Sequence, residues 1–179
     1  MKIQHRVQLI DLLNEYELPK RVVECGVAEG RFSEEVYNKG VEHLYLVDIW
    51  ESVPFIDGCA SFSEEWHCGN YNRVVSLFKD KPNVTILKGF SHKVASEVKD
   101  NSLGLVYIDG DHSYKGVMSD IHTWMPKLVS GGIMAFHDYA NEDYGVKRAV
   151  VEYVRKENKV NIIQEDGKTE NIGAWIKKQ

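Results

Sequence analysis

The sequence predicts an α/β fold in which a doubly wound, mostly parallel sheet of seven strands carries helices on both faces. Short apolar runs alternate with segments of helical periodicity along all 179 residues. The runs at 103–108 and 131–136 are apolar throughout, which is typical of strands that are buried on both faces. The pair Asp166-Gly167 between the last two predicted strands signals a turn, so the final strand is expected to be antiparallel.

Each element has a local signal. An amphipathic N-terminal helix is expected within residues 1–18, because its leucines recur on one face and Pro19 follows it. Runs of aliphatic and β-branched residues predict strands at 21–25, 43–48, 84–88, 103–109, 131–136, 160–164 and 172–176. Helical spacing of apolar residues, with Ser113 as a cap and Pro126 as a stop, predicts helices at 33–39, 64–78, 91–99, 113–124 and 146–157. No linker or repeat divides the chain, so residues 1–179 are interpreted as a single domain.

Composition excludes some functions. The chain is 43% hydrophobic and 27% charged, as ordinary globular proteins are, and its net charge of −5 argues against a nucleic-acid-binding surface. No segment has the apolar length of a signal peptide or a membrane span, and three cysteines make no disulfide framework. We therefore expect a cytoplasmic protein with a small-molecule partner, with no nucleic-acid or membrane partner, and compatible with a homo-oligomer.

Ionisable side chains follow two of the predicted buried strands. Asp109 and His112 lie just beyond the strand at 103–108, and His137 and Asp138 directly follow the strand at 131–136. The carboxyl ends of parallel strands meet at one edge of the sheet, which is where open α/β sheets bind ligands. Two clusters of the same chemistry predict a functional site there.

A glycine-containing turn follows the first predicted strand. Gly26 and Gly30 allow a tight turn before a helix N-terminus, Ala28 takes the place of a central glycine, and no third glycine completes a dinucleotide fingerprint. Asp48, at the end of the second strand, is placed to accept ribose hydroxyls, and Trp50 to cover an adenine face. The pattern favours an adenosine-containing ligand. Strand–helix packing, a helix cap and core packing are the structural alternatives for these residues.

Together these motifs resemble the class I S-adenosylmethionine-dependent methyltransferases, most closely the group of macrocin-type and mycinamicin-type O-methyltransferases. The resemblance runs over residues 22–138 and is carried by segments 24–30, 47–50, 108–117 with Asp120, and 131–138. It implies a Rossmann-like methyltransferase fold, in which an antiparallel last strand is a distinguishing detail.

The resemblance also implies roles for individual residues. S-adenosyl-L-methionine would contact Glu24, Gly26, Ala28, Gly30, Asp48, Trp50, Gly89, Phe90, Ser91 and Asp109. A divalent metal, Mg²⁺ or Mn²⁺, would be held by Asp109, His137 and Asp138. Asp109 and His112 would be catalytic, with His112 as the general base that deprotonates a hydroxyl of a sugar or phenol.

His137 departs from the pattern of the relatives, which have an acidic or amide residue at this position. Mg²⁺ prefers oxygen ligands, whereas imidazole suits later metals. Three interpretations remain open: His137 turns away, the metal is not Mg²⁺, or the site is lost. The alternative functions are a metal-independent methyltransferase and a non-catalytic S-adenosylmethionine-binding module. Residues 54–71, rich in aromatics, are either a cover over the site or a surface segment.

Overall fold

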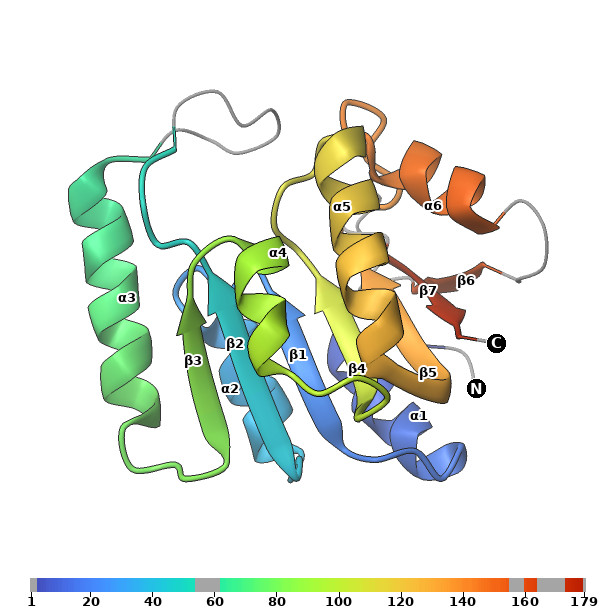
Figure 1. Cartoon of the computed structure of the whole chain (residues 1–179), viewed down its shortest axis with the longest axis horizontal. Helices are drawn as coiled ribbons and strands as arrows, with labels where there is room; N and C mark the ends of the chain where they lie inside the picture. Colours follow the sequence, from blue (N-terminus) through green and yellow to red (C-terminus); the bar gives the residue numbers. More distant parts are fainter. Residues whose placement is uncertain (1–2, 54–61, 155–159, 164–172, 179) are drawn as a thin grey trace.

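The computed structural model describes residues 3–53, 62–154, 160–163 and 173–178, and its centre is a sheet with the strand order β3-β2-β1-β4-β5-β7-β6 (Figure 1). The strands are β1 Arg21–Cys25, β2 His43–Asp48, β3 Val84–Lys88, β4 Leu103–Ile108, β5 Leu128–Phe136, β6 Asn161–Ile163 and β7 Gly173–Lys177. The first five strands pair in parallel, and β7 is antiparallel to both β5 and β6. The predicted fold class is confirmed.

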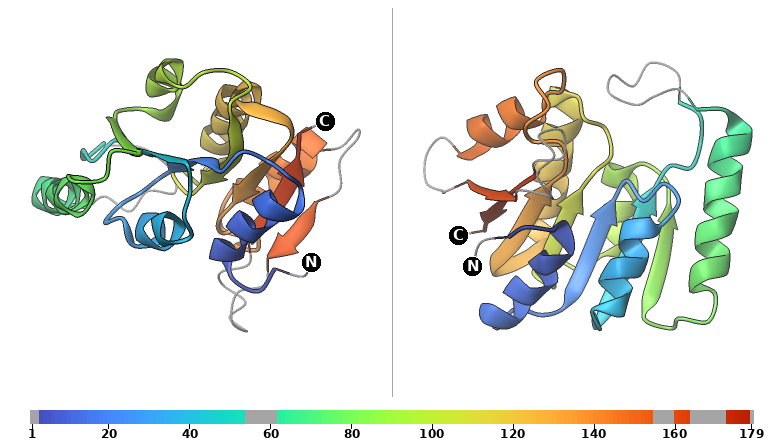
Figure 2. Two further views of the ribbon diagram at one scale, coloured as in Figure 1. Left: turned by 90° about the horizontal axis from the view of Figure 1, so that it is seen from below. Right: turned by 180° about the vertical axis from the view of Figure 1, so that it is seen from behind.

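Helices cover both faces of the sheet (Figure 2). Their bounds are η1 Arg6–Gln8, α1 Leu9–Glu15, α2 Arg31–Asn38, α3 Glu64–Phe78, α4 Ser91–Val94, η2 Ala95–Glu97, α5 Tyr114–Trp124, η3 Met125–Lys127 and α6 Val146–Val154. One apolar core joins α1, α2 and α3 to the sheet, and a second joins α4, α5 and α6 to it. Within the described ranges, no helix has the length and apolar character needed to cross a membrane.

Several boundaries differ from the sequence expectation for local reasons. The N-terminal segment is a 3₁₀ turn followed by a short α1, because the His5 side chain caps the turn at Val7 N. The helix at 91–99 is shorter than predicted: α4 ends at Val94 and passes into 3₁₀ geometry. Strand β5 begins at Leu128, ahead of Gly131, whose φ of +77° accommodates an irregularity within the strand. The predicted turn at 166–167 and the predicted end of α6 lie outside the described residues.

The carboxyl ends of β1, β2, β4 and β5 are joined beyond the strands themselves. Gly26 N donates to Val47 O at 2.8 Å, and Asp109 N donates to Cys25 O at 2.7 Å. Gly26 has a φ of +90°, and a Cβ on it would lie 2.1 Å from Asp109 O. Only glycine fits this position, so the loops after β1 and β4 are held in direct backbone contact.

Candidate active site

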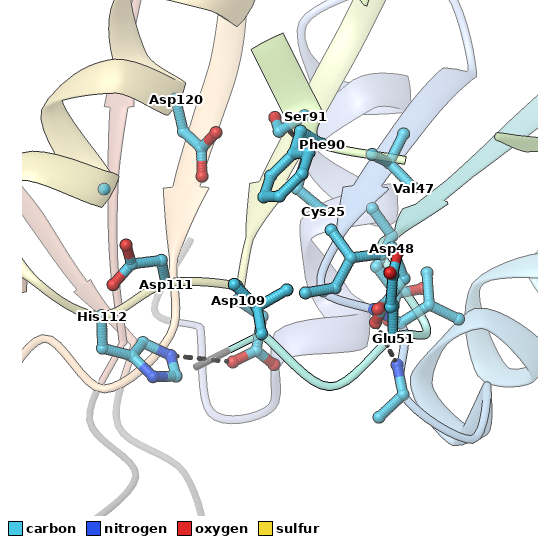
Figure 3. A pocket seen from close by; sticks show the side chains of 18 of the residues that line it. Cys25, Val47, Asp48, Glu51, Phe90, Ser91, Asp109, Asp111, His112 and Asp120 are labelled. Carbon is cyan, nitrogen blue, oxygen red and sulfur yellow. Dashed lines mark hydrogen bonds and ion pairs between the residues drawn. The ribbon is translucent and has the colours of Figure 1, made fainter. Parts of the chain in front are cut away.

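A cavity of about 650 Å³ lies along this edge of the sheet, a size typical of small-molecule sites (Figure 3). Gly26 and Ala28 line it from the loop after β1. Asp109 and His112 line it near the end of β4, and its other predicted lining residues are Glu24, Asp48, Gly89, Phe90 and Ser91. The structure therefore brings most of the predicted cofactor residues into one cavity.

Asp48 ties the end of β2 to the glycine turn. Its Oδ2 accepts hydrogen bonds from Val27 N at 2.9 Å and Ala28 N at 2.8 Å, and its Oδ1 accepts one from Trp50 N at 2.9 Å. These bonds hold Ala28 at a φ of +48°, a backbone conformation that non-glycine residues seldom adopt. A carboxylate has about four acceptor sites, so Asp48 keeps capacity for a ligand while it braces the turn.

Two residues predicted to contact the cofactor do not line the cavity. Trp50 is 2% exposed, packs against the Tyr71 ring at 5.2 Å between centroids, and donates its ring N–H to Ala28 O at 2.8 Å. The indole is part of the core and supports the glycine turn through its hydrogen bond to Ala28. The structure therefore corrects the prediction that Trp50 covers adenine. Gly30, with a φ of +82°, starts α2 and packs near Val74, so its role is in the turn geometry.

Four potential metal ligands converge where β4 and β5 end. Asp109, His112, His137 and Asp138 each offer a donor atom, and these atoms all lie within 4.8 Å of one another. His137 Nδ1 is 2.9 Å from Asp138 Oδ2 and 3.3 Å from Asp109 Oδ1. His112 Nε2 is 3.3 Å from Asp109 Oδ1 and 3.5 Å from Asp138 Oδ2. His137 therefore does not turn away from the carboxylates.

The charges in this cluster are strongly coupled. Burial alone would lower the pKa of His137, but the adjacent carboxylates of Asp138 and Asp109 outweigh burial and raise it. Burial alone would raise the pKa of Asp138, but the two histidines and Arg6 lower it. These contacts keep Asp138 ionised and favour positive charge at His137.

His112 is held both at its ring and at its backbone. It stacks on Tyr144 with ring centroids 4.8 Å apart and planes 12° from parallel. The backbone carbonyl of His112 accepts a hydrogen bond from Gly145 N at 2.8 Å. The loop before α6 therefore fixes the imidazole, leaving Nε2 directed at the carboxylates. The ring of Tyr144 supports His112, a role the sequence pattern did not indicate.

Glu24 is buried beneath the cavity, only 2% exposed. Ser33 Oγ donates to Glu24 Oε2 at 2.5 Å. Burial raises the pKa of Glu24 to about 8, against the lowering effect of the Ser33 hydrogen bond. This carboxyl group is therefore largely neutral at pH 7.

Several charged residues that line the cavity have no role assigned from the sequence, among them Arg6, Glu51 and Asp120. Arg6, from η1, lies over the Phe32 ring at 4.5 Å and has Nη1 3.6 Å from Asp109 Oδ2. Glu51 follows the buried Trp50, and Asp120 lies on the inner face of α5 (Figure 3). No sequence signal pairs Arg6 with β4. Asp120 belongs to the segments that carry the family resemblance, but its spacing from the other motif residues does not indicate what it binds.

The predicted cover segment is described only from residue 62 onward. Phe62 and Trp66 stack with ring centroids 4.0 Å apart, and both line the cavity although they are 43% and 38% exposed. Residues 54–61 lie outside the described residues, so the prediction of a cover stays a prediction.

Comparison with known proteins agrees with the geometry of the site. A family model described as a methyltransferase domain matches residues 23–139. The protein y4gI of Sinorhizobium fredii is 28% identical over 134 residues, which is 71% of this chain but 14% of y4gI. The chain therefore spans a small part of that relative.

Solved structures share the fold at low sequence identity. The O-methyltransferase NovP superposes with a TM-score of 0.69 at 18% identity, covering 97% of this chain and 77% of NovP. CalS11, a calicheamicin methyltransferase, gives a TM-score of 0.68 at 14% identity, covering 96% of this chain and 77% of CalS11. Since the family model spans more than half of the sequence and includes the glycine turn and both Asp/His clusters, the chain belongs to the methyltransferase-domain family, and it has the class I S-adenosylmethionine-dependent methyltransferase fold of these solved structures.

Proposed function

We propose that this enzyme methylates a hydroxyl group of a small molecule, with a divalent metal held at the ends of β4 and β5 and His112 as the general base. The observation that carries the proposal is the convergence of two carboxylates and two imidazoles within 4.8 Å at the cavity edge. The name of NovP, an O-methyltransferase of the same fold, supports the choice of a hydroxyl acceptor.

The residues fit a metal ion by their own chemistry. His137 Nδ1 is buried and has no aligned hydrogen bond within the described part of the chain, although Asp138 Oδ2 is only 2.9 Å away. Asp138 also has a φ of +51°, a strained conformation of the kind found at functional sites. Imidazole together with carboxylate suits Mn²⁺ and later transition metals better than Mg²⁺. Asp109, His137 and Asp138 would hold the ion.

The roles of the residues follow from their positions. When bound, the metal would lower the pKa of the acceptor hydroxyl. His112 Nε2 takes the hydroxyl proton, the acceptor oxygen forms a bond to the methyl carbon, and the carbon–sulfur electron pair returns to sulfur. The stacked Tyr144 ring keeps His112 from rotating away. The glycine turn, which Asp48 braces through the Val27 and Ala28 backbone, would hold the methyl donor together with Asp48.

Calorimetry with Mn²⁺ tests the metal site. The wild type should bind one ion, and Asp138→Asn should weaken binding at least about tenfold, since a charged ligand is lost. Asp111→Asn is the matched control, because Asp111 lines the same cavity outside the cluster, and it should bind Mn²⁺ as the wild type does. Equal affinities in all three proteins would contradict the assignment.

The His112→Ala variant tests whether His112 acts as the general base or has only a structural role. A screen of sugar and phenol hydroxyls first supplies an acceptor, and turnover on it should then fall by about 10²–10⁴-fold. Affinity for S-adenosylhomocysteine should stay nearly unchanged, because the base serves the acceptor. Full activity of the variant would show that the proton leaves by another route.

A metal-independent mechanism is the second candidate, and the position of Arg6 favours it. Its guanidinium lies 3.6 Å from Asp109 Oδ2 and supplies positive charge where a metal would. In this mechanism Asp109 and Asp138 bind the acceptor directly. Turnover that persists in a strong chelator would favour it over the metal-assisted reaction.

A further inference from the structure

Two aromatic side chains near the start of α3 have no role in the site described so far. Phe62 and Trp66 both line the cavity, and neither belongs to the two apolar cores. Trp66 is 38% exposed, whereas each of the other three tryptophans is at most 6% exposed. Aromatic side chains bury a large apolar area when they are covered, so an exposed pair inside a cavity indicates a surface for a ligand.

The position of this pair follows from how α3 packs. The buried residues of the helix are Val74 and Phe78, both in its second half. Figure 1 shows α3 extending beyond the carboxyl end of β3, so the first turns of the helix lie beside the end of the sheet that carries the cavity. Ser63 caps the helix by accepting a hydrogen bond from Trp66 N at 3.2 Å, which fixes the backbone that carries the indole.

The rings of Phe62 and Trp66 form a flat surface. They stack with centroids 4.0 Å apart and planes 16° from parallel, and the His67 ring stands nearly perpendicular to the indole, with centroids 5.0 Å apart. His67 Nδ1 is buried and has no hydrogen-bond partner in the described part of the chain. The cluster therefore offers a ring face for stacking, next to a polar atom whose partner a ligand would supply.

The methyl acceptor is the ligand that we expect at this surface. It must place a hydroxyl beside His112 and extend from there into the rest of the cavity, which Phe62 and Trp66 line. An aromatic ring suits a stacked pair, because parallel rings gain offset stacking in addition to the burial of apolar area. A sugar ring would need hydrogen-bond partners for several hydroxyl groups, whereas this pair offers ring contacts.

We propose that Phe62 and Trp66 form the binding platform for a planar aromatic ring of the methyl acceptor, which assigns the acceptor to the aromatic compounds and not to the free sugars. The proposal rests on methyl transfer to a hydroxyl of a small molecule. The reacting hydroxyl is on the ring or on a group attached to it. Trp66 then determines which acceptors bind, and the reaction at His112 does not depend on it.

Calorimetry in saturating S-adenosylhomocysteine compares 2-naphthol with decahydro-2-naphthol, which has the same ring carbons and hydroxyl but no flat aromatic surface. The wild type should bind 2-naphthol about three- to tenfold more tightly, which is the gain expected from aromatic stacking. Trp66→Leu keeps an apolar side chain without the flat face, so its preference should fall close to one. Val75→Ala, at an exposed apolar residue of α3 outside the cavity, is the matched control and should keep the wild-type preference.

The ratio of the two affinities separates ring recognition from other roles. Equal binding of both probes by the wild type, or an unchanged preference in Trp66→Leu, would overturn the proposal, and so would tighter binding of methyl β-D-glucopyranoside than of 2-naphthol. If Trp66→Leu weakens S-adenosylhomocysteine and leaves the ratio unchanged, the pair covers the methyl donor and the proposal is wrong. Failure of the proposed methyl transfer would leave the ratio unchanged, because binding of the probes needs neither the metal nor His112.

Discussion

Replacing Glu24 with glutamine should change how the stability of the protein depends on pH. Burial raises the pKa of Glu24 from 4.5 to about 8. Below pH 4.5 the carboxyl group is protonated in both the folded and the unfolded chain, and its full stabilising contribution is present. Between pH 4.5 and 8 only the folded chain keeps the proton, so unfolding releases it and the free energy of unfolding falls as pH rises.

The magnitude follows from the same values. A slope of about 1.4 kcal/mol per pH unit over this window gives an upper limit of about 5 kcal/mol, a large share of the stability of an ordinary domain. Glutamine cannot ionise, and its amide oxygen can still accept the Ser33 hydrogen bond. The free energy of unfolding of Glu24→Gln should therefore not show the fall between pH 4.5 and 8 that ionisation of Glu24 causes in the wild type.

Urea unfolding of both proteins from pH 5 to 9, followed by circular dichroism in a chelator and without ligand, measures the effect. The unfolding free energy of Glu24→Gln relative to that of the wild type should rise by several kcal/mol from pH 5 to pH 9. Glu97→Gln, a change at an exposed carboxylate, should parallel the wild type. Parallel curves for the wild type and Glu24→Gln would refute the reasoning, because they would show that Glu24 titrates alike in both states.

Two further predictions concern the loops that shape the cavity. Asp48→Ala should weaken S-adenosylhomocysteine binding in calorimetry by roughly 10- to 100-fold, since charge-assisted bonds are worth about 1.5–3 kcal/mol each; unchanged affinity in a folded variant would remove the ribose role. Gly26→Ala should lower the urea-unfolding free energy by more than about 1–3 kcal/mol, because its Cβ would lie 2.1 Å from Asp109 O. Gly40→Ala, at a φ of +73° with open space around it, should cost less, and equal losses would count against the contact.

The sequence predicted the strands well because their signal is local. The bounds of β1, β2 and β3 agree with the predicted ranges 21–25, 43–48 and 84–88, since each is an aliphatic run between turn residues. Convergence of the clusters at Asp109 and Asp138 also followed from sequence, because parallel pairing of β4 with β5 places both strand ends together.

Other features depend on tertiary contacts that no local pattern encodes. From the sequence alone, Trp50 is compatible with either a position over a ligand or a position in the core. In the structure it lies in the core, where its ring packs against Tyr71 and donates a hydrogen bond to the Ala28 carbonyl. The charge that Arg6 brings to Asp109 comes from the N-terminal segment, which is distant from Asp109 in the sequence. The burial of the Asp120 carboxyl group likewise becomes visible only when α5 is packed on the sheet.

The position of Arg6 has a practical consequence for how the protein is prepared. The segment before α1 is anchored by the buried Ile3 and by the cap between His5 and Gln8, and this anchoring delivers the guanidinium to Asp109. Deleting that segment, or straining it with a fused tag, would remove one positive charge from the neighbourhood of Asp109. A divalent cation would then bind a more negative site, so metal affinities measured on trimmed protein would overstate those of the full chain.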